Sequence, residues 1–219
     1  MAKKAAPRKP RKTIRDLPRH ILDAALELAA LQGWRDTTLA DVAEAAKLPL
    51  GKVLAVYPSK AAMVSAFART IDAKVLEADD PDLAGQPPRD RLFDVMMRRF
   101  DALGPHKEAT RAIVGATLCD PAAAVCGAFV LRRSMALMLE AAHIGSPGVC
   151  GGVRGMLRVK GLAAIHLAVL RVWFSDDSDD MTRTMAALDK RLRQAESLVM
   201  LCRLAGRRRA APEADAESA

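Results

Sequence analysis

Alanine dominates the chain and constrains its fold more than any other feature. The 219 residues include 42 alanines but only 6 isoleucines and 8 threonines. Alanine has the highest helix propensity, whereas β-branched residues favour strands. Hydrophobic residues make up 51% of the chain, so it can bury a sizeable core. The composition therefore predicts an all-α fold, and we find no apolar run that approaches the roughly 20 residues of a membrane span.

The positive charge of the chain is concentrated at its beginning. The formal net charge is +8, and residues 1–20 contain eight Lys or Arg side chains against one Asp. Such an arm adds sequence-independent affinity for nucleic-acid phosphates, because its binding releases counterions. The alternative is a solubilising, disordered terminus. No apolar segment follows the charges, so the arm is not a secretory signal and we expect a cytoplasmic protein.

The sequence contains no recognisable catalytic or metal-binding constellation. The four cysteines form no C-x-x-C pair, and G-x-S-x-G, Walker A, G-x-G-x-x-G and H-E-x-x-H motifs are absent. The acidic run 176–180 lacks the glycine and distal glutamate of a calcium loop, so we interpret it as a cap for the helix that follows. We therefore expect no enzyme, no cofactor and no metal.

Apolar periodicity and helix-end signals divide the chain into about nine helices. They are predicted at 17–32, 38–46, 50–56, 60–77, 88–103, 106–118, 121–143, 151–175 and 179–203. Thr38 with Asp41 three positions on marks one helix start, and Gly33 marks a stop. The predicted organisation is a basic disordered arm (1–13), a three-helix head (14–78), a larger helical body (88–203) and a disordered tail (204–219).

The two short helices of the head are joined by a turn at Lys47-Leu48-Pro49. Two short helices held at a fixed angle by longer ones are typical of a helix-turn-helix unit, which places its second helix in the DNA major groove.

The stretch from Arg15 to Ile71 resembles the TetR family of bacterial transcriptional regulators. The matching pieces are Ile21-Leu22-Asp23-Ala24-Ala25, Gly33-Trp34, Thr37-Thr38, Asp41-Val42-Ala43-Glu44-Ala45-Ala46, Gly51 and Tyr57-Pro58-Ser59-Lys60-Ala61-Ala62-Met63. The resemblance implies a DNA-binding head on a body that binds a small ligand and dimerises through its last two helices.

The candidate DNA-binding residues lie in the arm and the head. Lys52 has the side chain to read a base edge, and Thr38, Lys47 and Lys60 are placed to contact phosphates. Arg11 and Arg15 could enter a minor groove. Gly51 and Tyr57 complete the set because they belong to the matching motif.

The second short helix departs from the family pattern. The family usually presents serine, lysine, threonine, tyrosine and histidine toward DNA, whereas this helix offers mainly Leu50, Leu54, Ala55 and Val56. Lys52 is its one side chain that hydrogen-bonds to base edges. Weak sequence discrimination and a loss of DNA binding are both open interpretations.

A second, looser resemblance covers Arg158 to Arg193. Trp173-Phe174-Ser175-Asp176-Asp177-Ser178 and Ala187-Leu188-Asp189-Lys190-Arg191-Leu192 look like the corresponding region of the ubiquinone-biosynthesis accessory lipid-binding proteins. Those proteins share the TetR-type fold but do not regulate transcription. This resemblance implies a body that holds an isoprenoid or lipid, and a final amphipathic helix that meets a membrane.

The middle helices of the body carry large, adaptable side chains suited to a small hydrophobic ligand. The candidate ligand-binding residues are Met96, Met97, Phe100, Phe129, Met135, Met138, Met156, His166, Leu170 and Trp173. The alternative for each is an ordinary place in the core, with His166 satisfied there.

The last two helices carry faces suited to dimerisation, since helix 151–175 is apolar on several sides and helix 179–203 has a stripe at spacings of four and three. The candidate interface residues are Gly161, Ala164, Ala168, Met185, Leu188, Leu192 and Val199. The alternative is that both stripes lie within a monomeric core.

Together these features predict a homodimeric transcriptional repressor that binds a near-palindromic double-stranded DNA operator, is controlled by a small hydrophobic ligand and does not span a membrane. The alternative is a lipid-binding or isoprenoid-binding accessory protein of the same fold that does not bind DNA.

Overall fold

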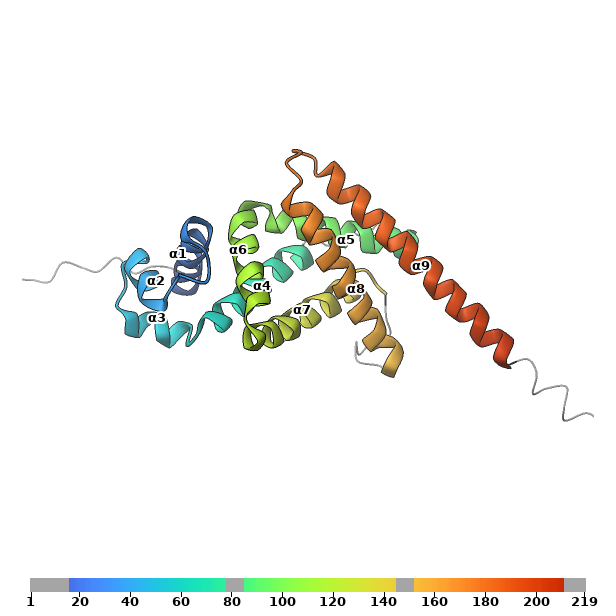
Figure 1. The fold of residues 1–219 in the computed structure, drawn as a ribbon, viewed down its shortest axis with the longest axis horizontal. Coiled ribbons are helices and arrows are strands. Elements are labelled where there is room, and N and C mark those ends of the chain that lie inside the picture. The colour runs from blue at the N-terminus through green and yellow to red at the C-terminus, as the bar shows by residue number, and fades with distance from the viewer. Residues whose placement is uncertain (1–15, 78–84, 145–151, 211–219) are drawn as a thin grey trace, which may run out of the picture.

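The structure is a computed structural model that describes residues 16–77, 85–144 and 152–210. The helices are α1 (Leu17–Gln32), α2 (Leu39–Ala45), α3 (Leu50–Val56), α4 (Lys60–Glu77), α5 (Pro88–Leu103), the 3-10 turn η2 (Gly104–His106), α6 (Lys107–Cys119), α7 (Pro121–Ala141), α8 (Gly152–Phe174) and α9 (Thr182–Ala210). These ranges contain no strand, so the predicted all-α fold is confirmed. Helices α1 to α3 form a head at one end, and α4 leads from it into a body of α5 to α9 (Figure 1).

Helix α1 anchors the head through one apolar stripe. Ile21, Ala25 and Ala29, spaced four residues apart, are each at most 1% exposed. The Asp16 carboxylate accepts a hydrogen bond from the Arg19 amide at 3.2 Å and so caps the first turn. Helix α1 contacts α6 as well as α2 and α4, so the head contacts the body through α1 as well as through the connecting helix α4.

Helix α2 begins with the predicted capping box. The Thr38 hydroxyl accepts a hydrogen bond from the Asp41 amide at 3.2 Å, and the Asp41 carboxylate accepts one from the Thr38 amide at 2.7 Å. The bond from the Thr38 amide lowers the pKa of Asp41. Val42 of α2 and Val53 of α3 are at most 1% exposed, and Ala43 of α2 is also buried, so each short helix is fixed by buried residues near its middle.

The turn between α2 and α3 places a lysine in the left-handed backbone region. Lys47 has φ +54°. The Lys47 amide donates to the Glu44 carbonyl and the Leu48 amide to the Ala43 carbonyl, both at 2.9 Å, which is the Schellman pattern of a helix end. Glycine is the usual residue at such a position, so Lys47 holds this turn at a steric cost.

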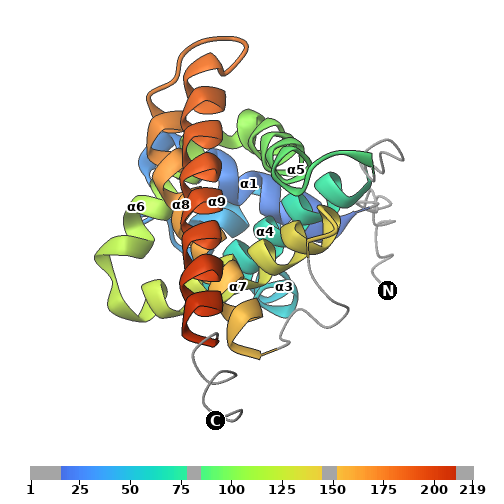
Figure 2. The same cartoon turned by 90° about the vertical axis from the view of Figure 1, so that its right-hand side faces the viewer.

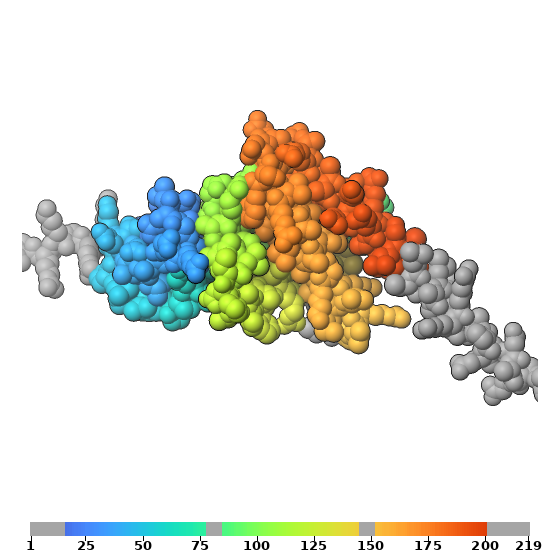
Figure 3. Space-filling view, viewed as in Figure 1, coloured from blue at the N-terminus to red at the C-terminus, as the bar shows by residue number. Residues whose placement is uncertain are grey.

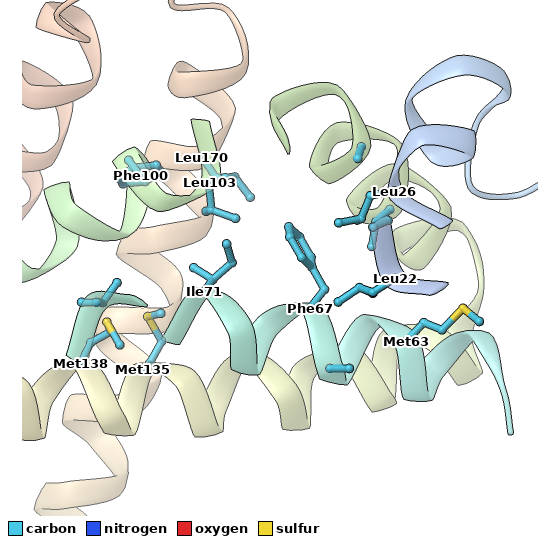
Figure 4. Packing of buried hydrophobic residues seen from close by; sticks show 14 of the residues in the cluster. Leu22, Leu26, Met63, Phe67, Ile71, Phe100, Leu103, Met135, Met138 and Leu170 are labelled. Atoms are coloured by element: carbon cyan, nitrogen blue, oxygen red, sulfur yellow. The ribbon is translucent and has the colours of Figure 1, made fainter. Parts of the chain in front are cut away.

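Helix α4 carries the hydrophobic core from the head into the body (Figure 4). Met63, Phe67 and Ile71 are buried and spaced four residues apart, so they share one side of the helix. In the close-up, Phe67 points toward Leu26 of α1, whereas Ile71 points toward Leu103 of α5. The core is therefore continuous between head and body.

A buried ion pair joins α4, α5 and α7. Arg99 Nη1 donates to Asp72 Oδ1, and Ser134 Oγ donates to Asp72 Oδ2 at 2.7 Å. The Arg99 and Asp72 side chains are 6% and 5% exposed. Burial lowers the pKa of the Arg99 guanidinium, and the charge of Asp72 opposes that shift. Three helices are thus fixed at one polar contact inside the core.

Helix α7 is long and apolar enough to cross a membrane by length and composition. The expectation that no apolar run approaches that length was therefore wrong for residues 121–141. One such helix is weak evidence of a membrane span; 22% of its apolar window is buried, and α7 contributes the buried Met135 and Met138 to the core. It packs along α4, α6 and α8.

Helices α8 and α9 form an antiparallel pair, and the far end of α9 runs away from the body (Figures 1 and 2). Helix α9 continues to Ala210, so residues 204–210 are helical and the predicted disordered tail is wrong there. The reason is local, because this segment consists of Leu, Ala and Arg with a single Gly206 and no proline before Pro212. The predicted arm (1–13) and residues 211–219 lie outside the described ranges.

Replacement of the buried carboxylate tests the Asp72–Arg99 pair. We expect Asp72→Asn to lower the free energy of unfolding by about 3–5 kcal/mol, because it leaves the Arg99 charge buried without a counterion. Urea denaturation measures the change. Asp189→Asn, which removes the surface pair with the 65%-exposed Arg193, is the control and should cost at most about 1 kcal/mol. Equal losses in the two variants would contradict the assignment.

Candidate nucleic-acid interface

The outward face of α3 is nearly devoid of hydrogen-bonding side chains. Leu50 and Leu54 are 42% and 41% exposed, and Gly51, Lys52 and Ala55 are exposed beside them. Val53, on the opposite side of the helix, is fully buried and fixes α3 to the head. Lys52 is the one outward residue of α3 with a polar side chain. The apolar outward face that the sequence predicts for residues 50–56 is therefore exposed in the structure.

Two other candidate DNA-binding residues are exposed in the same helix-turn-helix unit. Thr38 lies at the start of α2 and Lys47 in the turn before α3. The Thr38 hydroxyl already accepts the Asp41 amide but keeps its own hydrogen for a phosphate oxygen. Arg11 and Arg15 lie outside the described ranges.

Lys60 has internal partners rather than a free ammonium group. Its Nζ donates to the Trp34 carbonyl oxygen and to the Arg35 carbonyl oxygen, the latter at 3.3 Å, and lies 4.8 Å from the centroid of the Trp34 ring. Burial lowers its pKa. These contacts tie the α1–α2 loop to the start of α4. The geometry thus favours a bracing role for Lys60 over the phosphate contact expected from the sequence.

Tyr57 also points inward. It is 7% exposed, and its hydroxyl donates to the Pro18 carbonyl oxygen at 3.2 Å. Burial raises the pKa of this phenol. Tyr57 follows the last residue of α3 and Pro18 lies in the first turn of α1, so this bond holds α3 against α1. Its contribution to an interface is to position α3 rather than to touch a partner.

The candidate ligand-binding residues divide into a closed cluster and two exposed side chains. Buried members are Met96, Phe100, Met135, Met138, His166, Leu170 and Trp173, while Met97 is partly buried. Phe129 and Met156 are 62% and 49% exposed and so lie apart from that cluster. Phe129 instead lines a surface groove of about 210 Å³ between α4 and α7, with Arg69 and Arg133.

His166 is an unsatisfied polar group inside the closed cluster. Its ring centroid lies 5.3 Å from that of Phe100, which in turn lies 5.8 Å from Trp173. Within the described residues, His166 Nδ1 and Thr110 Oγ1 are buried without a hydrogen-bond partner. Burial and the nearby Arg99 charge lower the pKa of His166 to about 3. The imidazole is therefore neutral at physiological pH.

The candidate dimer-interface residues also divide. Gly161 and Ala164 are exposed on α8, Ala168 is partly buried, and Val199 on α9 is 50% exposed. Met185 is partly buried, whereas Leu188 and Leu192 are 0% and 4% exposed and belong to the core of the protomer. Leu188 and Leu192 therefore pack inside the protomer. This agrees, for these two residues, with the alternative that the stripe lies within a monomeric core.

The acidic run between α8 and α9 caps helix α9. Asp176 Oδ2 accepts hydrogen bonds from the Thr184 amide at 2.8 Å and from its hydroxyl at 2.6 Å, and Asp180 accepts from the Thr182 amide at 3.2 Å. Burial would raise the pKa of Asp176, but the hydrogen bonds from Ser178 and Thr184 outweigh it and lower the pKa. Among the described residues, no group of three His, Cys, Asp or Glu side chains is arranged to hold a metal.

The described residues thus combine a helix-turn-helix head, the connecting helix α4 and a larger helical body. Residues 21–67 match the family model of bacterial regulatory proteins of the tetR family. This match covers the head of the chain, which is therefore similar to the tetR family of bacterial regulatory proteins.

Solved structures extend this likeness beyond the head. A TetR transcriptional regulator from Nitrosomonas europaea is 22% identical, with a TM-score of 0.67 over 82% of this chain and 98% of that chain. A TetR regulator from Rhodococcus is 22% identical, with a TM-score of 0.54 over 80% and 93%. Thermus thermophilus FadR, a TetR-family repressor solved with lauroyl-CoA, is 19% identical, with a TM-score of 0.55 over 80% and 91%. No curated protein matches the chain.

Relief of backbone strain at the α2–α3 turn is measurable. We expect Lys47→Gly to raise the free energy of unfolding by about 0.5–1 kcal/mol, because glycine adopts φ +54° without a steric cost. Thermal or urea unfolding measures the change. Lys47→Ala is the matched control, since it removes the charge but keeps a Cβ, and it should bring no such gain. Equal stabilities of the two variants would contradict the strain.

The buried imidazole predicts a pH dependence of stability. The folded-state pKa of His166 is about 3, below the ordinary value of 6.5, so the unfolded chain binds more protons between these values. His166 therefore lowers stability as the pH falls from about 7 to 5, by about 2 kcal/mol. We expect His166→Leu to remove this slope in urea unfolding curves measured at both pH values. Parallel pH profiles for the variant and the native protein would contradict it.

Proposed function

We propose that the protein binds double-stranded DNA operators as a homodimer and represses transcription until a small hydrophobic ligand enters its body. The observation that carries this proposal is the folded helix-turn-helix unit. Its α3 is fixed to the head by Val53 and Tyr57 and leaves its opposite face exposed. Such a helix fits the major groove of B-DNA, which is wide enough to admit one α-helix.

Electrostatic affinity for DNA is proposed to come from few groups. Residues 16–77 contain seven Lys or Arg and eight Asp or Glu residues, so the described head is not basic as a whole. Lys47 and Lys52 are exposed at the DNA-facing end, and Lys60 is engaged internally. The basic arm, with Arg11 and Arg15, would then supply most of the phosphate contacts.

Dimerisation is proposed to occur through the uncovered face of α8. In the space-filling view α8 lies on the surface of the body beside α6 and α9 (Figure 3). Val153, Leu157, Gly161 and Ala164 are exposed there at spacings of four and three, with Val153 at 76% and Leu157 at 68%. Small residues within such a stripe permit close approach of a second helix, and a symmetric dimer would cover the stripe on both copies.

Ligand entry is proposed to open the closed cluster around Phe100. The cluster is mostly apolar, but it contains the unsatisfied His166 Nδ1, and the buried Arg99, whose Nε is also unsatisfied, lies close enough to lower the pKa of His166; it therefore suits a largely apolar molecule with a polar group. The complex of T. thermophilus FadR with lauroyl-CoA supports a ligand with an acyl-like apolar part. Phe100 follows Arg99 in α5, so its displacement would disturb the contact with Asp72 on α4 and thereby change the position of the head.

A lipid-binding accessory role is the second candidate, and the end of α9 favours it. Leu198, Val199 and Met200 are 62%, 50% and 60% exposed where α9 leaves the body. Exposed apolar residues on a protruding helix suit a lipid surface. Mass spectrometry of an organic extract of native protein separates the candidates, because the carrier should yield a stoichiometric isoprenoid and show no preference among DNA sequences.

Selection from random duplexes at low salt tests the proposed function. We expect enrichment of an inverted repeat by the native protein. Ala164→Glu should be monomeric by light scattering and should lose the preference for two half-sites, whereas Ala128→Glu on the exposed part of α7 should retain both properties.

Deletion of residues 1–13, with six Lys or Arg, should reduce the slope of log K against log salt by up to about five. No enrichment over random competitor would contradict DNA recognition.

A further inference from the structure

The outward arc of α3 has an apolar centre. At 100° per residue, Gly51 lies at the middle of this arc, Leu54 and Ala55 flank it, and Leu50 and Lys52 stand at its edges. A Cβ on Gly51 would meet no atom within 4 Å, so none of the residues that the structure describes covers the centre of the arc. The helix backbone can therefore approach a partner closely at Gly51, with leucine and alanine side chains around it.

The chemistry of this arc matches one group on the edges of base pairs. In the major groove, guanine, adenine and cytosine present hydrogen-bond donors and acceptors, whereas thymine adds an apolar C5-methyl group. Leucine and alanine side chains laid against donors or acceptors would strip them of water without replacing the lost hydrogen bonds. The same side chains laid against methyl groups bury apolar surface on both partners.

We propose that α3 recognises its operator mainly through thymine methyl groups, which contact Leu50, Leu54 and Ala55, while Lys52 supplies the single polar base contact at the edge. This inference rests on the proposed function and specifies how that function selects a sequence. It predicts half-sites with a cluster of thymines in the stretch facing α3, and a guanine at its border, since lysine pairs with guanine O6 and N7.

The exposure of the two leucines has no other explanation in the described protomer. Leu50 and Leu54 lie one turn apart on a helix of the head, away from the α8 stripe and from the closed cluster of the body. Alanine at either position would retain helix propensity and remove exposed apolar area. The exposed parts of the two leucines are therefore available to a partner of the α3 face, and truncation to alanine tests that contact.

Replacement of thymine by deoxyuridine tests the inference, because it removes only the methyl group. The probe is the duplex that the full-length protein enriches from a random library, resynthesised with uracil at one thymine at a time and then at all of them. We expect each contacted methyl to contribute roughly fourfold in Kd, the factor that corresponds to about 0.8 kcal/mol for one buried carbon. Uracil outside the α3 contact should leave Kd unchanged.

Leu54→Ala links the effect to the protein side chain. This variant should bind the thymine duplex several-fold more weakly, and it should lose no further affinity at the thymine that Leu54 contacts when that base becomes uracil. Leu118→Ala, which truncates a 66%-exposed leucine of the body, is the matched control and should behave as the native protein. Thermal melts of both variants verify that the fold is retained.

The outcomes separate this inference from the proposed function. If no duplex is enriched, DNA recognition fails and the methyl contact fails with it. If a duplex is enriched but the fully uracil-substituted form binds equally well, methyl recognition alone is overturned and the regulator remains. A position-specific loss that disappears in Leu54→Ala supports both.

Discussion

The contact of Asp72 with Arg99 and Ser134 fixes the helix on which the whole arrangement depends. Asp72 lies on α4, which leaves the head and enters the body, and its two partners come from α5 and α7. Breaking a buried ion pair by removing one partner is costly, so this contact favours the described position of α4 relative to both body helices. The head, held to α4 by Met63 and Phe67, takes its orientation from this contact.

Inside the head, polar side chains are used in internal hydrogen bonds, and the outer face of α3 keeps Lys52 as its one polar side chain. Tyr57 and Lys60, two of the polar residues in the family-like motif, are used internally, on the carbonyl oxygens of Pro18 and of Trp34 and Arg35. What remains outside is Lys52 among leucine, glycine and alanine. The head thus keeps the helix-turn-helix arrangement, and the outward face of α3 is apolar where a polar face would offer hydrogen bonds to base edges.

Much of the fold could be predicted from the sequence because helix ends are local features. The Thr38–Asp41 capping box, the Gly33 stop and the apolar spacing along the chain predict α1, α3, α4 and α5 with the bounds observed. They involve residues within a few positions of one another, which is the range over which sequence patterns specify hydrogen bonds.

Contacts between distant segments were not predictable in the same way. The buried pair joins residues 27 positions apart, and the Tyr57 bond spans 39 positions. Periodicity identified Leu188 and Leu192 as an apolar stripe but not the helix that covers them, which proves to lie in the same protomer. For the same reason Phe129 and Met156, apolar residues of middle helices, were placed in a ligand site although both are exposed.

Photochemical cross-linking tests most directly whether the α3 face enters the DNA groove. A selected duplex with 5-bromodeoxyuridine in place of thymine is irradiated with the native protein, and the linked peptide is sequenced by mass spectrometry. We expect the linkage within residues 50–56, because these side chains are placed against the methyl position. Cross-links confined to the body, or found equally on unselected duplexes, would contradict the account.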